Sequence, residues 1–298
     1  IRYGRIIQGS NPCKETIYIK TKKGMNRMTG YQSEAIFHLP GAFEHIPMYK
    51  TLLFLWENER HVFRDNVKIG SVYGAPSGIW NGGRILPRQF FAQEELQDIK
   101  NIYNKLDIPV RFTFTNCLIE EKHLSDSYCN MVLDLFSDGK NEIICNSEIL
   151  ENYIRKKYGD KYKYISSTTK CHKAQEEQKQ ELEKNYHLVV LDYNHNNNFE
   201  FLKSLSLELR NKIEVLCNCA CQPNCPFRAD HYEQVSRAQL NFTLFHKQDG
   251  CIGGYETYYK AKQLASYISP EDINNKYLPL GITTFPFLSI KPHFPFNL

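Results

Sequence analysis

The cysteines between positions 217 and 225 are the residues best suited to chemistry in this chain. Cys217, Cys219, Cys221 and Cys225 fall in the run CNCACQPNC. Thiolates at CxxxC spacing can reach one metal ion or one iron–sulfur cluster. Cys221 and Cys225 form the best pair, since Pro223 stiffens the loop between them. We therefore expect a metal centre that includes these two thiols.

Further ligands for such a centre must come from other parts of the chain. Cys171 follows a predicted strand and Cys251 lies in a glycine-rich loop, and we take both as ligands from their predicted positions. Thiolate ligation by four cysteines favours a [4Fe–4S] cluster or a structural zinc ion, and the spacing does not separate the two. His172, His231 and His246 are alternative ligands in a zinc site.

Polar residues stand where several predicted strands end. The candidates for catalysis are Asn116, Asn146, Asp192 and Asn194. An Asn side chain offers two donors and an acceptor, so a ring of them suits a neutral ligand such as a base, a sugar or an aromatic acid. Asn is also common at strand ends because it tolerates turns and caps. A structural role for these residues therefore stays open.

The loop after the first predicted strand adds candidates for substrate binding. The full set is Tyr73, Ser77, Trp80, Asn81, Arg84, Asn218 and Arg228. Gly82 and Gly83 would let the backbone approach a ligand closely. Trp80 is suited to stacking, and Arg84 to pairing with a carboxylate or phosphate. The alternative is a structural turn with a packed Trp80.

Strands and helices alternate along the chain and position these residues. Strands are expected at 67–73, 110–115, 142–145, 163–166, 188–193, 213–216 and 280–285, with helices between most of them. This alternation predicts a parallel sheet and favours a TIM-type (β/α) barrel over an open doubly wound sheet. Prolines at 286, 292 and 295 follow the last strand, so we expect the barrel to be incomplete at its C-terminal end.

The chain is expected to form one domain with an extension. Residues 1–38 are basic in part and poorly periodic, which indicates an N-terminal extension or arm. A Leu-Pro-Gly break follows at 39–41. Residues 39–298 are assigned to the single barrel.

The amino-acid composition is that of a globular protein and does not identify a binding partner. The 298 residues are 42% hydrophobic and 23% charged, as in ordinary globular proteins. The net charge of +4 is spread along the chain and neither requires nor excludes a nucleic-acid partner. No apolar run is long enough to cross a membrane. Without a signal peptide, we expect a cytoplasmic protein with reduced cysteines rather than a secreted protein with disulfides. The sequence leaves the oligomeric state open.

Residues 67–285 resemble the collagenase-like peptidase superfamily. The resemblance rests on the CQPNCPFR motif from Cys221 to Arg228, the strand LVVLDYN, the strand end SSTT and the phrase YLPLGITTF. Family members often continue that phrase as KIEGR, whereas here Pro286 begins PFL. The Glu and Arg of that phrase are therefore not present at these positions.

The resemblance implies a barrel with a four-cysteine iron–sulfur cluster, in which Cys221 and Cys225 would be two of the ligands. It also implies oxygen-independent hydroxylation of an RNA base or a small aromatic molecule. Our leading hypothesis is therefore an iron–sulfur barrel enzyme that modifies an RNA base, a small aromatic molecule or a peptide. The alternatives are a zinc-stabilised binding protein without catalysis and a peptidase or other hydrolase.

Overall fold

The computed structural model describes residues 34–83, 89–219, 221–243 and 266–288, and the strand residues 20–21 and 24–25. The chain divides into two compact units, Ile1–Gln32 and Ser33–Leu298. In the first unit, strands β1 (Lys20–Thr21) and β2 (Gly24–Met25) pair antiparallel.

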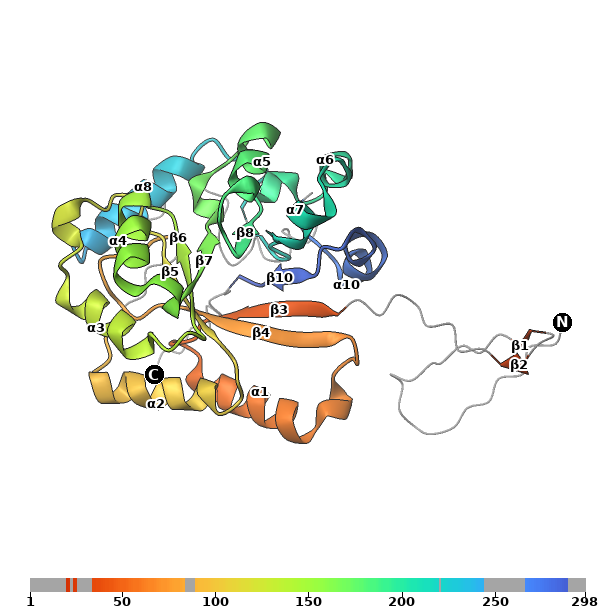
Figure 1. Ribbon diagram of the computed structural model, residues 1–298, viewed down its shortest axis with the longest axis horizontal. Helices are drawn as coiled ribbons and strands as arrows, with labels where there is room; N and C mark the ends of the chain where they lie inside the picture. The colour runs from red at the N-terminus through yellow and green to blue at the C-terminus, as the bar shows by residue number, and fades with distance from the viewer. Residues whose placement is uncertain are drawn as a thin grey trace, which may run out of the picture. The chain divides into compact units, whose positions relative to one another are not determined.

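Eight parallel strands of the second unit form a closed barrel (Figure 1). The strands, in chain order, are β3 (Ala35–Pro40), β4 (Val67–Gly74), β5 (Val110–Phe114), β6 (Glu142–Cys145), β7 (Lys163–Ser166), β8 (Leu188–Val190), β9 (Ile213–Glu214) and β10 (Thr284–Pro286). Each pairs with its neighbour in sequence, and β10 pairs with both β9 and β3. This pairing closes the sheet.

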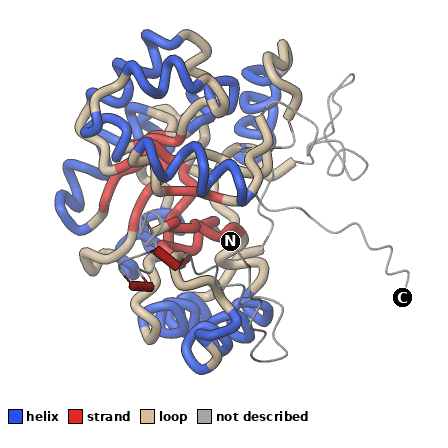
Figure 2. Tube along the Cα trace, turned by 90° about the vertical axis from the view of Figure 1, so that its right-hand side faces the viewer, coloured by secondary structure: helices blue, strands red, loops and turns tan. Residues whose placement is uncertain are grey.

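Helices follow most of the strands and cover the outside of the barrel (Figure 2). They are α1 (Ile46–Asn58), α2 (Gln93–Asn104), α3 (Ser127–Phe136), α4 (Glu148–Tyr158), α5 (Gln175–Glu183), α6 (Phe199–Ser204), α7 (Leu207–Asn211), α8 (Arg228–Leu240) and α10 (Pro270–Asp272). Among the described helices, none combines the length and the hydropathy of a membrane span.

The predicted TIM-type barrel is confirmed, but its expected incompleteness is wrong. The eighth strand is β3, which precedes the predicted start of the barrel and overlaps the predicted extension 1–38. Thr284 pairs with Ile36, and Pro286 with His38. Pro286 is accommodated because it is the last residue of β10, where a missing N–H costs little. The run AIFHLP was overlooked because it lies between a basic segment and a Pro-Gly break.

A separate apolar cluster comprises Ile144, Ile165, Leu188, Val190 and Leu216. Because strand side chains alternate between two faces, Glu142 lies on the same face of β6 as Ile144. Asn146, Asp192 and Asn218 follow the carboxyl ends of β6, β8 and β9. The strand period therefore places the predicted polar residues at the carboxyl end, where barrel enzymes carry their sites.

Candidate functional site

Arg228 is the central cation of the carboxyl end. It is the first residue of α8, and the residue is only 3% exposed. It donates to the Asp192 carboxylate, and Nη2 donates to the Thr168 carbonyl at 2.6 Å and to Thr168 Oγ1 at 2.9 Å. The guanidinium lies 4.1 Å from the Tyr193 ring centroid. Arg228 therefore ties the start of α8 to the ends of β7 and β8.

Cys171 lies beside this cation in an unusual backbone conformation. It follows the 3-10 turn Thr168–Lys170 and has φ 60° and ψ 43°, in the left-handed region. Such a conformation is uncommon for a residue other than glycine, and it clusters at functional sites. The thiol is partly exposed and donates to the Thr169 carbonyl at 3.4 Å. A partly exposed thiol is therefore held at a fixed place on the rim.

Burial and nearby charged groups act on the pKa of the Cys171 thiol in opposite directions. Burial raises its pKa above the ordinary value, the Arg228 guanidinium opposes that rise, and the Asp192 carboxylate adds to it. Lys173 has a smaller lowering effect and Cys117 a smaller raising one. The thiolate is therefore favoured by Arg228 and disfavoured by Asp192 and by desolvation.

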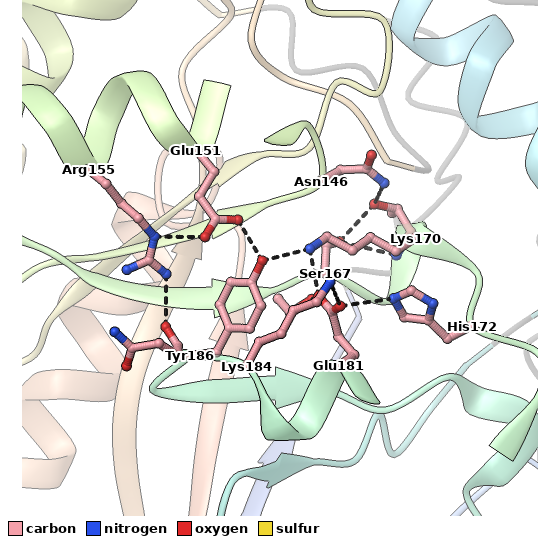
Figure 3. A network of polar contacts seen from close by, with 12 residues as sticks. Asn146, Glu151, Arg155, Ser167, Lys170, His172, Glu181, Lys184 and Tyr186 are labelled. Carbon is pink, nitrogen blue, oxygen red and sulfur yellow. Dashed lines mark hydrogen bonds and ion pairs between the residues drawn. The ribbon is translucent and has the colours of Figure 1, made fainter. Parts of the chain in front are cut away.

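A chain of hydroxyl and amide groups continues along the rim from Cys171. Asn146 donates to Thr169 Oγ1 at 2.8 Å, and that hydroxyl lies 2.8 Å from Ser167 Oγ (Figure 3). Asn146 is partly exposed, so its amide lies at the mouth of the barrel. Asn146, which follows β6, thus bonds to the turn that precedes Cys171.

Behind this turn, a polar network fills the space between β7, α4 and α5 (Figure 3). Glu181 accepts hydrogen bonds from Ser166, from Lys170 at 2.6 Å and from Lys184 at 2.6 Å. His172 Nε2 lies 3.5 Å from the same carboxylate. Burial raises the pKa of Glu181, but these partners outweigh burial and hold it well below the usual range. Glu181 therefore fixes the turn that carries Cys171.

Asn194 connects the end of β8 to the cysteine-rich loop. Its Oδ1 accepts from the Asn224 N–H at 2.8 Å, and its own N–H donates to Asp192 at 3.0 Å. Its Nδ2 is buried and has no hydrogen-bond partner among the described residues. Asn194 thus offers a donor next to the Asp192–Arg228 pair.

The predicted metal ligands are not assembled by the described residues. Cys221 and Cys225 are partly exposed in one loop, and Cys251 lies outside the described residues. Within the described ranges, no three His, Cys, Asp or Glu side chains gather in an arrangement that could hold a metal ion. Cys171, Cys221 and Cys225 are thus not gathered into such a group, and the four-cysteine centre stays a prediction.

The loop after β4 is packed into the protein rather than open to a ligand. Trp80 is fully buried, and its ring N–H donates to the His123 carbonyl at 2.8 Å. Ser77 and Asn81 are also buried, and Arg84 lies outside the described residues. A Cβ on Gly82 would lie 2.5 Å from the Thr115 carbonyl oxygen, so this glycine permits contact with the end of β5. The structure supports the alternative of a structural turn for the described part of this loop.

Three other predicted residues make structural bonds. Asn116 is fully buried, donates to the Ile79 and Ser236 carbonyls and accepts from the Leu118 N–H. Asn218 pairs with the backbone of Leu288 in both directions. Tyr73 donates to the Phe287 carbonyl. Asn218 and Tyr73 thereby hold the segment after β10 against the barrel.

A buried ionic network at the amino end was not predicted. Arg111 forms ion pairs with Glu142 and Glu214, and its Nη2 lies 3.3 Å from His38 Nε2. The other His38 nitrogen lies 2.8 Å from Ser71 Oγ. Burial lowers the pKa of His38 and raises that of Glu214. The sequence signal for this network was a charged residue inside a short apolar strand, as in VRFTF and KIEV.

Comparison with known proteins identifies a fold neighbour. No family model matches the chain, and no curated protein matches it. The chain is similar in structure to the U32 peptidase Mk0906, with a TM-score of 0.55 and 13% sequence identity. The match covers 92% of this chain and 100% of the other. At this identity the likeness shows a shared fold.

Proposed function

We propose that this barrel is a peptidase-like hydrolase whose nucleophile is the Cys171 thiol. The observation that carries the proposal is the placement of Cys171, which is partly exposed, left-handed and bonded through its N–H to a carbonyl that the buried Arg228 guanidinium also holds. Barrel enzymes act at that end. The fold likeness to a U32 peptidase supports a peptide as substrate.

The proposed reaction is hydrolysis of an amide in two steps. The sulfur of Cys171 attacks the carbonyl carbon, the C–N bond breaks, and the thiol proton ends on the leaving amine. Water then cleaves the thioester, which releases the acid and restores the thiol. We assign the amide groups of Asn146 and Asn194 to the substrate carbonyl, because both lie at this end of the barrel.

A peptide library tests this function. The wild-type protein should cleave members of the library, iodoacetamide should abolish cleavage, and Cys171→Ser should lower the rate at least about 100-fold. Cys117→Ser is the matched control, because Cys117 is another partly exposed thiol of the rim. Unchanged cleavage in Cys171→Ser, or no cleavage by the wild type, would refute the proposal.

A second proposal concerns Cys221 and Cys225, whose loop is fixed by the Asn194–Asn224 bond and by Arg228. Two partly exposed thiols in one anchored loop favour binding of a thiophilic metal, either zinc or an iron–sulfur cluster. Oxygen-independent hydroxylation is expected only if the bound metal is an iron–sulfur cluster. Metal and sulfide analysis separates the two.

A further inference from the structure

We propose that the barrel binds peptides at its carboxyl end through a subsite for an aliphatic side chain, and that the chain's own Leu288 occupies this subsite. The assignment rests on the proposed function, because it takes a peptide as the substrate. It goes beyond that function by naming the side-chain pocket, the residues that hold the peptide backbone and the segment that a substrate must displace.

The subsite lies on the inner face of the barrel wall. Its members come from β6, β7 and β8 and from the segment after β9: Ile144, Ile165, Leu188, Val190 and Leu216. Their sequence neighbours Ile143 and Val189 belong instead to the core cluster that contains Leu150 of α4 and Leu182 of α5. Strand side chains alternate between two faces, and the helices cover the outside (Figure 2). The five side chains therefore face the interior, and we call them the interior cluster.

Leu288 reaches the interior cluster from the segment that follows β10. It is partly buried and packs against that cluster. Phe287 packs against the other core cluster, and its ring stacks on Phe37 with the centroids 5.3 Å apart. Successive side chains of this segment therefore point to opposite sides, as they do in an extended strand, and Leu288 is the one directed inward.

The backbone of Leu288 is held in the way that a bound peptide is held. Its N–H donates to Asn218 Oδ1 at 2.6 Å, and Asn218 Nδ2 donates to its carbonyl at 3.1 Å. The preceding carbonyl, that of Phe287, accepts from the Tyr73 hydroxyl. Asn218 follows β9 and Tyr73 belongs to β4, so the segment is held from both sides of β10 and β3. Bonds to main-chain groups do not depend on the sequence of the bound segment.

These contacts define the class of ligand. Main-chain bonds to Asn218 and Tyr73 supply affinity for an extended peptide, and the interior cluster selects an aliphatic side chain such as leucine. The segment with Leu288 is tethered to β10 and competes at an effective concentration on the order of millimolar. A peptide therefore binds only when Leu288 leaves the interior cluster.

The test is binding of the amidated peptide PFLS, the sequence of residues 286–289, to Cys171→Ser protein with isotope-labelled isoleucine methyl groups. The NMR signals of Ile144 and Ile165 report on the subsite. Leu288→Asn removes the aliphatic side chain with little change in size, so this variant should bind the peptide at least about tenfold more tightly than its parent. Leu207→Asn is the matched control and should bind like the parent, since Leu207 is an exposed leucine of α7.

Tighter binding by Leu288→Asn supports the inference when it is lost with the peptide PFNS and on addition of Asn218→Ala. Equal binding by Leu288→Asn and its parent, or unmoved isoleucine signals in both, overturns it. If Leu288→Asn does not fold, Leu288→Ala decides the question, with a gain of the same sign. The parent lacks the Cys171 thiol, so peptide binding without cleavage by the wild type contradicts the proposed function alone.

Discussion

Cys171 and Arg228 donate hydrogen bonds to the same carbonyl oxygen, that of Thr168. The two residues are far apart in sequence, one after β7 and the other at the start of α8. Their shared acceptor explains how a residue with a side chain is kept in the left-handed region at the rim.

The backbone conformation of Cys171 predicts that glycine is tolerated better than valine at this position. A β-branched residue is poorly tolerated at φ 60°, so Cys171→Val should lower the free energy of unfolding by about 1–2 kcal/mol. Cys171→Gly should stay within about 0.5 kcal/mol of the wild type, since glycine adopts this conformation freely. Urea denaturation measures both. Equal losses in the two variants would show that side-chain packing, rather than the backbone, governs this position.

The ionic network at the amino end should be sensitive to loss of its cation. Arg111→Met leaves the carboxylates of Glu142 and Glu214 buried without their partner, and we expect a loss of about 3–5 kcal/mol in unfolding free energy. Adding Glu142→Gln and Glu214→Gln should recover most of that loss, because no unpaired charge then remains. Chemical denaturation of the single and triple variants checks this. A triple variant less stable than Arg111→Met would contradict the account.

The Glu181 network predicts a dependence of stability on acid. Its folded-state pKa is depressed, so the stabilisation is present above the ordinary carboxyl value of 4.5 and is lost as pH falls from there toward the lower folded value. The slope of unfolding free energy against pH should therefore be smaller in Glu181→Gln than in the wild type below about pH 5. Denaturation at successive pH values measures both slopes. Identical slopes would show that Glu181 is not ionically coupled to Lys170 and Lys184.

Metal content tests the cysteine-rich loop independently of catalysis. Protein purified without oxygen should contain zinc, or iron with sulfide, and Cys221→Ala/Cys225→Ala should lack it. Cys129→Ala is the control, since this cysteine is buried in α3. Metal retained in the double variant, or no metal in the wild type, would reject these two thiols as ligands.

The barrel was predictable from sequence because strand length and helix periodicity recur along the chain. Seven of the eight strands were assigned from short apolar runs between helices. The run 35–40 was missed, because a strand of six residues beside a Pro-Gly break carries little periodic signal of its own.

The candidate site was less accessible to sequence reasoning. Asp192 and Asn146 were expected at the ends of predicted strands, and the structure places them directly after β8 and β6. Trp80 and Asn116 instead bond to backbone carbonyls inside the protein, and such contacts depend on packing that a single sequence does not specify. Thr168 was not singled out, because its role comes from a backbone carbonyl, which every residue has.

The most direct test of the central claim is to trap the acyl-enzyme. The wild-type protein would be mixed with a cleaved peptide from the library, quenched in acid and digested, and Cys171 examined by mass spectrometry. The account predicts a thioester on Cys171 whose mass equals that of the amino-terminal product less water, and none in Cys171→Ser. Peptide cleavage with no adduct on Cys171, or with an adduct on another cysteine, would contradict it.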